Sequence, residues 1–405
     1  MDTCADIEAA AGALPQQPAA PALAAPRTNR RPRQARRVPD SITNDPQLAV
    51  AMAALPANYN FEIPKTIWKI QELVREAAVG MPKVALQFPE GLLMYSCAIA
   101  DILERFAGCE CVVLGDVTYG ACCIDDLTAK SLGCDMMVHY GHSCLVPVSA
   151  TVIRCLYVFV EIAIDVDHLC ECVKKTFAAG TEVALMGTIQ FASAVHEART
   201  RLAEHLPGTS VPQAKPLSPG EVLGCTSPAI DGKTALVFVA DGRFHLESAM
   251  IQNPHMEHLR YDPYSKVLSR EGYDTDKMRA LRRAAIDRAR GATAFGVILG
   301  TLGRQGNPHI LDRLLSILTK HGKRHFVMLL SEIFPAKLAA VRGVDAWIQV
   351  ACPRLSIDWG HFFDKPLLSP YEAEVCLGET DWRAVYPMDF YAKSGGSWSN
   401  GFTAR

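Results

Sequence analysis

The chain has 405 residues, 49% of them hydrophobic, and a formal net charge of −2. This length predicts two to three domains with sizeable cores, and the near-neutral charge gives no reason to expect nucleic acid as the main partner. No apolar run approaches the roughly 20 residues of a membrane span, and the N-terminus lacks the apolar core of a secretory signal. The 14 cysteines are therefore expected as reduced thiols, metal ligands or core packing rather than as disulfides.

The cysteine spacing argues against several common sites. No Cys-x-x-Cys is present, which disfavours a zinc ribbon or a thioredoxin-type site. The pairs Cys109/Cys111 and Cys170/Cys172 fall in or beside apolar segments, and we interpret both as packing. The compact three-cysteine motif of ordinary radical enzymes is absent as well. A metal cluster in this chain would have to be built from distant residues.

Residues 1–60 are expected to form a disordered tail. Alanine and proline dominate up to Pro26, and six arginines follow within 27–37. Such a composition cannot bury enough apolar surface to fold. A solvated linker is the favoured interpretation of the arginine run. The alternatives are a basic patch that contacts ribosomal or factor surfaces, a nuclear signal and, least favoured because acidic residues precede it, a mitochondrial transit peptide.

A regular alternation of helices and strands begins at Phe61. Pro64 suits the first position of a helix whose apolar residues follow helical spacing and which Gly80 ends. The further elements expected in this first unit are strands at 83–88, 111–117, 136–140 and 156–162, and a helix at 92–106.

The same alternation restarts twice. The second unit is expected to contain helices that begin at Asp165 or Asp167 and at 192, a helix at 244–251, and strands at 183–186, at 235–240 and near Leu259. The third unit is expected to contain a helix that begins at Asp274, helices around 311–318 and at 336–341, and a last helix that begins at Ser369-Pro370. Its expected strands are 295–299, 325–330 and 346–350. This alternation favours parallel sheets with right-handed crossovers.

Two adjacent thiols, Cys122 and Cys123, follow the 111–117 strand and a turn at Tyr119-Gly120. Asp125 is a plausible N-cap for a short helix after them. The thiols therefore lie beyond a strand end, on a loop that opens a helix, which is where open α/β sheets place their chemistry. A helix N-terminus also favours the thiolate, the form that binds metals. A buried structural pair is an equally compatible interpretation.

Six segments together resemble one family. They are DVTYGACCIDD, HYGHSCLVP, LGCTSP, VADGRFHLE, GTLGRQGN and QVACPRLSIDWG, within a match that covers about 61–377. These strings resemble the catalytic subunit of diphthamide synthase, the 2-(3-amino-3-carboxypropyl)histidine synthase family of eukaryotes and archaea. In that family three cysteines, one from each of three domains, hold a 4Fe–4S cluster.

The resemblance implies a ligand set and an architecture. The matching cysteines are Cys122, Cys225 and Cys352; Cys123 is the alternative to its neighbour, but the cysteine directly after Tyr-Gly-Ala fits best. Three similar parallel-sheet α/β domains would surround the cluster in a pseudo-threefold triangular arrangement. The expected parts are a tail at 1–60, domains at 61–164, 165–273 and 274–380, and an irregular, poorly ordered C-terminal tail at 381–405.

The implied activity is the first step of diphthamide biosynthesis. Three thiolates leave one iron of the cluster without a protein ligand. In the resembled family that iron binds S-adenosylmethionine, and the reduced cluster cleaves the sulfur–Cγ bond in a non-classical radical reaction. The 3-amino-3-carboxypropyl fragment is transferred to C2 of a histidine imidazole in elongation factor 2. No catalytic residue is expected beyond the cluster ligands.

The expected contacts with S-adenosylmethionine are His142, Ser143, Gly303, Arg304 and Gln305. Arg304 lies in a loop in which every third residue is glycine, after a strand and before a helix, and its guanidinium could bind the carboxylate of S-adenosylmethionine. An exposed ion pair is the equal alternative, and the loop itself is more often an ordinary turn. A satisfied core histidine is the alternative for His142.

Two other functions are alternatives. One is a three-cysteine 4Fe–4S lyase of the quinolinate synthase type, in which the open iron acts as a Lewis acid. The other is a non-catalytic subunit of a heterodimer. The partners that the resemblance implies are a related second subunit, elongation factor 2 and a small metal-binding electron donor, with no membrane and no direct nucleic acid. The expected location is the cytoplasm, with the nucleus as a second option.

Overall fold

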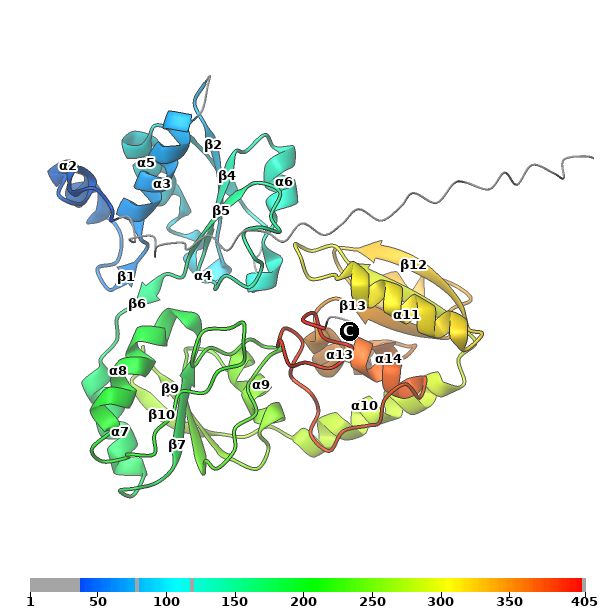
Figure 1. Ribbon diagram of the computed structural model, residues 1–405. Helices are drawn as coiled ribbons and strands as arrows, with labels where there is room; N and C mark the ends of the chain where they lie inside the picture. Colours follow the sequence, from blue (N-terminus) through cyan, green and yellow to red (C-terminus); the bar gives the residue numbers. More distant parts are fainter. Residues whose placement is uncertain (1–36, 77–79, 117–119, 403–405) are drawn as a thin grey trace, which may run out of the picture. The chain divides into compact units, whose positions relative to one another are not determined.

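The computed structural model describes residues 37–76, 80–116 and 120–402. The chain divides into the units Met1–Arg37 and Val38–Arg405. The expected disorder of 1–36 therefore lies outside the described residues. Within Val38–Arg405 the described strands form three four-stranded sheets and one two-stranded pairing, and each sheet carries its own helices (Figure 1).

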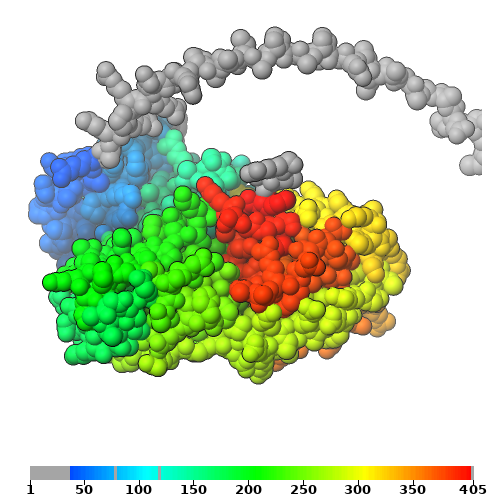
Figure 2. Space-filling model, turned by 60° about the horizontal axis from the view of Figure 1, so that its bottom comes forward, coloured from blue at the N-terminus to red at the C-terminus, as the bar shows by residue number. Residues whose placement is uncertain are grey.

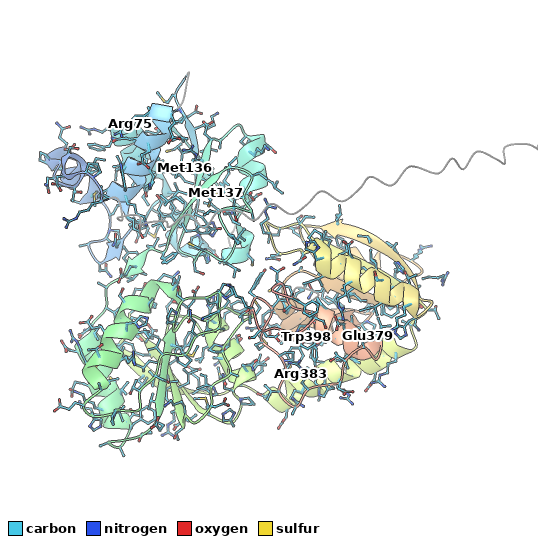
Figure 3. All side chains as sticks on the ribbon, in the orientation of Figure 1. Arg75, Met136, Met137, Glu379, Arg383 and Trp398 are labelled. Carbon is cyan, nitrogen blue, oxygen red and sulfur yellow. The ribbon has the colours of Figure 1, made fainter. Side chains whose placement is uncertain are left out.

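The first domain is built on a parallel sheet with strand order β3-β2-β4-β5. Met136 and Met137 are adjacent on β4 and are both buried, in two different core clusters (Figure 3). This is expected of a strand whose successive side chains point to opposite, covered faces. Its elements are α3 (Ile63–Glu76), β2 (Lys83–Gln87), α4 (Glu90–Leu93), α5 (Ser96–Ala107), β3 (Glu110–Leu114), η1 (Ala121–Cys123), α6 (Asp126–Ser131), β4 (Met136–Tyr140) and β5 (Arg154–Val158).

The second domain has the strand order β10-β9-β8-β7. Three strands are parallel, and β10 pairs antiparallel with β9. The described elements are α7 (Val166–Thr176), β7 (Val183–Gly187), η2 (Ile189–Phe191), α8 (Ala192–Leu202), β8 (Ala235–Val239), α9 (Phe244–Gln252), β9 (Glu257–Asp262) and β10 (Val267–Glu271). The antiparallel β10 was not predicted, because only two of its five residues are apolar.

An irregular segment covers the free edge of β7. Ser210 and Glu221 make isolated parallel bridges to Ala184 and Gly187. This segment occupies the place that a second strand takes in the other two domains. The prolines in 207–219 provide no backbone N–H, so a full ladder cannot form there.

The third domain repeats the strand order of the first, as β12-β11-β13-β14, with every pairing parallel. Edge strand β12 leaves Phe326, Val327 and Leu329 exposed. The elements are α10 (Thr275–Arg290), β11 (Ala294–Gly300), α11 (Pro308–Lys320), β12 (Arg324–Leu330), α12 (Pro335–Ala339), β13 (Ala346–Val350), α13 (Pro353–Trp359), η3 (Gly360–Phe362), β14 (Leu367–Leu368) and α14 (Pro370–Cys376).

The expected disorder is wrong for the chain from Val38 to residue 60. This stretch forms α1 (Asp40–Thr43), α2 (Pro46–Met52) and β1 (Tyr59–Asn60), and β1 pairs with β6 (Glu161–Ile162). Asp45 caps α2 through the N–H groups of Gln47 and Leu48. Ile42, Leu48 and Leu55 are buried in the core of the first domain. These three side chains supply the apolar surface that the alanine- and arginine-rich residues before them lack.

The expectation of a poorly ordered C-terminal tail is also wrong. The segment 381–402 contains no helix or strand, as expected, but it is packed against the second and third domains (Figure 2). The ring of Trp398 is buried beneath Arg383, whose guanidinium carbon lies 4.5 Å from the ring centroid (Figure 3). Aromatic burial, not backbone regularity, holds this segment in place.

Several local predictions are confirmed. Asp125, Asp165 and Asp274 cap their helices through side-chain hydrogen bonds. The pairs Cys109/Cys111 and Cys170/Cys172 pack in or against domain cores. No disulfide links the cysteines that the structure describes. Within the described residues, no helix combines the length and apolarity needed to cross a membrane.

Candidate active site

The first cysteine loop follows β3 and includes the short helix η1. The Cys123 N–H donates to the Gly120 carbonyl at 2.9 Å, and the Asp125 side chain accepts from the Thr128 N–H and starts α6. Cys123 is buried, whereas Cys122 is partly exposed. The amide of Gln87 on β2 donates to the Cys123 carbonyl at 2.9 Å. The adjacent thiols therefore have different surroundings.

The glycine-rich loop of the third domain packs directly on these thiols. A Cβ on Gly303, whose φ is +54°, would lie 2.6 Å from the Cys123 backbone. Only glycine permits this approach. The Arg304 N–H donates to the Cys122 carbonyl at 2.8 Å, and the Gln305 amide lies 3.3 Å from the Cys123 sulfur. The loop is therefore more than an ordinary turn, because it joins the third domain to the first.

Arg304 and Asp126 form a two-bonded ion pair between these domains. Nε and Nη2 of Arg304 donate to the two carboxylate oxygens at 2.9 and 2.7 Å, and Asp126 also accepts from the Val152 N–H. Burial raises the pKa of Asp126, but the bonds from Arg304 and Val152 outweigh it and lower the pKa overall. Arg304 thus binds a carboxylate of this chain. Its expected contact with S-adenosylmethionine stays a prediction.

The second cysteine, Cys225, lies in a tight turn of the second domain. Leu223 and Thr226 exchange backbone hydrogen bonds across it. The C-terminal segment covers this turn, because the Phe390 N–H donates to the Cys225 carbonyl and the Tyr391 N–H donates to the Thr226 hydroxyl. The segment that was expected to be a loose tail therefore forms part of the site.

The third cysteine, Cys352, follows β13 and precedes α13. Two residues later, Arg354 reaches the second domain. It bonds Asp358 through Nε at 2.9 and 3.0 Å, donates to the Phe244 carbonyl at 2.8 Å, and contacts Glu247 and the Gly224 carbonyl. Its guanidinium lies 4.3 Å from the centroid of the Phe244 ring. Arg354 therefore ties the Cys352 helix to the turn that carries Cys225.

The three cysteines meet where the domains meet. The pKa of Cys122 is raised by a hydrogen bond with Cys123, by burial, and by the nearby thiols of Cys225 and Cys352. Burial and then the Cys352 charge raise the pKa of Cys225. Tyr391 is buried close to the three thiols, and the pKa of its hydroxyl is raised by burial and by the charges of Cys122, Cys225 and Cys352. No helical or alternating pattern surrounds Tyr391, so the sequence gives no sign of its place in the site.

These thiols fit a multinuclear cluster better than a single ion. Among the residues that the structure describes, no three His, Cys, Asp or Glu side chains are grouped closely enough to hold one metal ion. An iron–sulfur cluster is wider than an ion and holds its thiolates further apart. Three thiols that repel one another as thiolates also need a cationic group to remain deprotonated. The donor set therefore fits a cluster.

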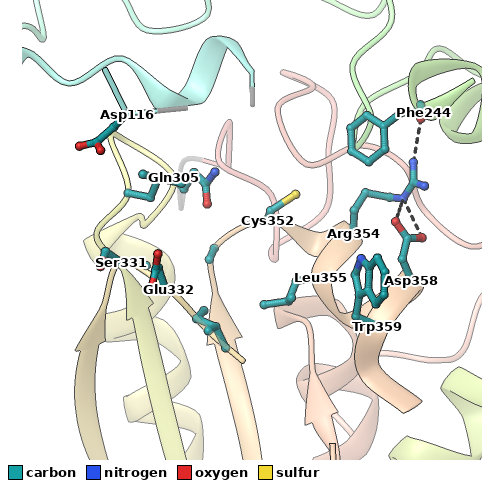
Figure 4. Close-up of a pocket in the computed structure, with 14 residues that line it drawn as sticks. Asp116, Phe244, Gln305, Ser331, Glu332, Cys352, Arg354, Leu355, Asp358 and Trp359 are labelled. Atoms are coloured by element: carbon teal, nitrogen blue, oxygen red, sulfur yellow. Dashed lines mark hydrogen bonds and ion pairs between the residues drawn. The ribbon is translucent and has the colours of Figure 1, made fainter. Parts of the chain in front are cut away.

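A cavity of about 660 Å³ opens beside Cys352 (Figure 4). Asp116 and Glu332 lie on one side of this thiol, and Phe244 and Trp359 lie on the other. Gln305 also lines the cavity. An opening of this size beside three convergent thiols admits a small-molecule substrate.

Two of the expected contact residues lie elsewhere. His142 lines a second cavity of about 410 Å³ with Gln190 and His245, between the first and second domains. Burial and the neighbouring His245 lower the pKa of His142 to about 4, so its ring is neutral. Ser143 is buried next to it. Phe244 lines both cavities.

Three further residues stand close to the site. Arg243 forms ion pairs with Glu247 and Glu271. Trp359 lines the larger cavity but is 58% exposed, so it is not core packing. Arg354, which the sequence analysis did not select, stands two positions after Cys352 inside the QVACPRLSIDWG segment.

The fold and the site define a three-domain α/β protein in which each domain contacts the other two around a thiol-lined junction. The family model described as "Putative diphthamide synthesis protein" matches residues 88–387, and the chain belongs to this family. The chain is 55% identical over 375 residues to the 2-(3-amino-3-carboxypropyl)histidine synthase subunit 1 of Dictyostelium discoideum, covering 90% of this chain and 78% of the relative. For the Homo sapiens protein of the same name the identity is 57% over 374 residues, covering 91% and 84%.

Solved structures agree with the architecture. The crystal structure of Dph2 from Pyrococcus horikoshii with a 4Fe-4S cluster is 29% identical, has a TM-score of 0.66, and matches 80% of this chain and 92% of that one. A second crystal structure of Dph2 from the same organism has a TM-score of 0.64 and covers 78% and 91%. The pseudo-threefold arrangement of α/β domains expected from the sequence is thereby confirmed.

Proposed function

We propose that this chain holds a 4Fe–4S cluster through Cys122, Cys225 and Cys352 and transfers a 3-amino-3-carboxypropyl group. The donor is S-adenosylmethionine, and the acceptor is C2 of a histidine imidazole in elongation factor 2. The observation that carries the proposal is the convergence of one thiol from each of three domains beside an open cavity. When bound, the cluster supplies an open coordination position and one electron for the sulfonium.

The chain's own residues position the reactants. The cavity beside Cys352 would hold the co-substrate, and the Gln305 amide is the expected contact that lies on its wall. The ion pairs of Arg304 and Arg354 fix the loops around the thiols. Burial of Tyr391 over the same thiols excludes water from that side. His142 lines the neighbouring cavity, and Phe244 lines both cavities.

The two alternatives receive less support. The names of the relatives favour a synthase over a quinolinate-type lyase. A purely structural subunit would not need three convergent thiols, one from each of three domains, next to an open cavity. The name "subunit 1" also supports a second subunit in the assembly, which we propose is a related chain in a heterodimer. A small metal-binding electron donor and a cytoplasmic location complete the proposal.

The proposed ligands are tested by replacing each cysteine in turn. Cys122→Ala, Cys225→Ala and Cys352→Ala should each remove the broad absorption of an iron–sulfur centre after anaerobic reconstitution. Cys109→Ala and Cys172→Ala are the matched controls and should keep it. Cys123→Ala distinguishes the two adjacent thiols, and retained iron in that variant assigns the ligand to Cys122. Normal iron and sulfide content in the three main variants would refute the ligand set.

The proposed reaction is tested by its products. The reduced protein, with its second subunit, should convert S-adenosylmethionine to 5′-methylthioadenosine and an aminobutyrate-derived fragment. When elongation factor 2 is supplied, 5′-methylthioadenosine should form together with modified elongation factor 2. A predominance of 5′-deoxyadenosine and methionine would mean that the other sulfur–carbon bond breaks. That result would overturn the proposed transfer.

A further inference from the structure

Exposed aromatic side chains stand at the mouth of the cavity that contains Cys352. Trp359 is 58% exposed, Phe362 is 57% exposed and Phe244 is 43% exposed. Trp359 and Phe362 lie together, with ring centroids 5.7 Å apart. Large apolar side chains that gather on a surface in this way are uncommon outside interaction sites. We name these three residues the aromatic ridge.

The aromatic ridge separates two hollows. On one side is the 660 Å³ cavity with Cys352, and on the other is a shallower hollow of about 500 Å³ lined by Tyr273, Met278 and Leu281. Phe244 and Trp359 line both. Leu281 is itself 39% exposed. A partner that reaches over the ridge can therefore place one group next to the thiols and an apolar group in the second hollow.

The opposite side of the mouth is acidic. Asp116 and Glu332 line the cavity across from the ridge (Figure 4). Within the described part of the chain, neither carboxylate has an ion-pair partner. The mouth thus offers apolar contact on one side and negative charge on the other, which suits a segment with apolar and basic side chains on either side of the group that enters.

We infer that the aromatic ridge and the shallower hollow form the docking surface for the protein that carries the acceptor histidine. This inference rests on the proposed function, because only a protein acceptor must bring a large surface to the mouth. A histidine that reaches the cavity brings its flanking residues onto Phe244, Trp359 and Phe362. A permanently bound subunit on the same surface would cover Trp359 and close the mouth, so the second subunit is not its occupant.

Arg354 gives the ridge its shape. The guanidinium lies against the ring of Phe244, while its bonds to Asp358 hold the helix that ends at Trp359. The two aromatic side chains of the ridge that line the cavity are therefore fixed before a partner arrives. Preorganised aromatic groups lose little freedom on binding and commonly dominate the affinity of an interface.

The inference is tested by direct binding. Purified elongation factor 2 is titrated onto the protein assembled with its second subunit, without S-adenosylmethionine, and the dissociation constant is measured. Trp359→Ala should weaken binding about tenfold, and the double variant with Phe362→Ala should weaken it further. Phe402→Ala is the matched control: this aromatic is 41% exposed, stacks on Arg313 and lines neither hollow, so binding should stay within about twofold of wild type.

The outcomes separate the docking surface from the reaction. An unchanged dissociation constant in the double variant overturns the inference, even if S-adenosylmethionine is still cleaved. Loss of the second subunit from the double variant, seen by light scattering, with unchanged binding of elongation factor 2, assigns the surface to the subunit and also overturns it. Weakened binding together with an absence of S-adenosylmethionine cleavage in the wild type supports the docking surface but refutes the proposed reaction.

Discussion

Two arginines of the third domain, Arg354 and Arg304, each reach across a domain boundary beside a cysteine loop, but in different surroundings. The side chain of Arg354 is 4% exposed and contacts two carboxylates, two carbonyls and an aromatic ring. That of Arg304 is 29% exposed, and among the residues that the structure describes its side chain forms an ion pair with Asp126 alone. The arginine contact with the second domain is therefore buried and has many partners, whereas the arginine side-chain contact with the first domain is a single ion pair. The boundary between the third and first domains, next to Cys122, should therefore open more readily than the boundary between the third and second domains, next to Cys225.

The largest effect is expected from removing the C-terminal segment, which is packed against the second and third domains near their Arg354 boundary. Deleting 382–405 exposes the apolar surface beneath Tyr386, Phe390 and Trp398. At about 1.5–3 kcal/mol for each of these three buried side chains, the free energy of unfolding should fall by about 4.5–9 kcal/mol. Chemical denaturation should show a lower midpoint for the truncated protein. A chain that lacks only 403–405 is the control, and equal stability of the two truncations would contradict the role given to the segment.

The next largest effect is expected for Arg354→Ala. It leaves Asp358 without its arginine partner, removes one of the two arginines that bind Glu247, takes a donor from two carbonyls and opens a cavity. The free energy of unfolding should therefore fall by about 3–5 kcal/mol. Arg354→Lys keeps the charge but not the planar fork, and it should recover only part of the loss. Equilibrium denaturation at neutral pH measures both. Full recovery by lysine would show that charge alone matters at this boundary.

Arg304→Ala should lower the free energy of unfolding by less, about 2 kcal/mol, because water can reach the space that the partly exposed arginine leaves. The loss should depend on pH. The pKa of Asp126 is lowered in the folded wild-type protein, so its contribution is present above the unfolded pKa and disappears as the pH falls through the folded value. Without Arg304, burial dominates and the pKa rises. The difference in stability between wild type and variant should therefore be largest at neutral pH and shrink below about pH 4.

A double variant sharpens that prediction. Arg304→Ala combined with Asp126→Ala removes the buried carboxylate together with its partner, and it should be more stable than Arg304→Ala alone at neutral pH. Stability measured across pH 3 to 7, roughly the range in which carboxylates titrate, tests the assignment. If the loss of stability in Arg304→Ala did not change with pH, the titration of Asp126 would not be its cause.

The smallest effect is expected at the N-terminus. Deleting Met1–Arg37 should change the free energy of unfolding by less than about 0.5 kcal/mol, since its alanines, prolines and arginines offer little to a core. Deletion through residue 56 is the contrast, because it also removes the buried Ile42, Leu48 and Leu55. It should destabilise the first domain clearly in a thermal melt. Equal melting temperatures for the two deletions would show that these three side chains contribute nothing.

The parts of the fold that the sequence predicted share one property: a local signal. The strand Ala346–Val350 and the helix Pro370–Cys376 have the predicted bounds, because an unbroken apolar run and a Ser-Pro start can be recognised within a few residues. Strand β10 was missed, since an edge hairpin needs only one apolar face and this one has few apolar residues.

The site was harder to predict from the sequence than the fold, because it depends on contacts between residues that are distant in the chain. No residue near Arg304 indicates that its partner is Asp126, which lies 178 positions earlier. Tyr391 lies in a segment without helical or alternating spacing, yet it covers all three thiols. The abundance of aromatic residues after Trp382 is the one signal that pointed to burial there. The cysteine set itself came from the family resemblance, since spacing alone did not select it.

The open edge of the third domain has a practical consequence. Strand β12 presents an unpaired backbone and the exposed side chains of Phe326, Val327 and Leu329, whereas the irregular proline-containing segment protects the corresponding edge beside β7. A strand from another molecule can add to such an edge and continue the sheet. Concentrated preparations of the isolated chain should therefore self-associate, and a charged substitution such as Val327→Lys should raise the concentration at which the protein stays monodisperse.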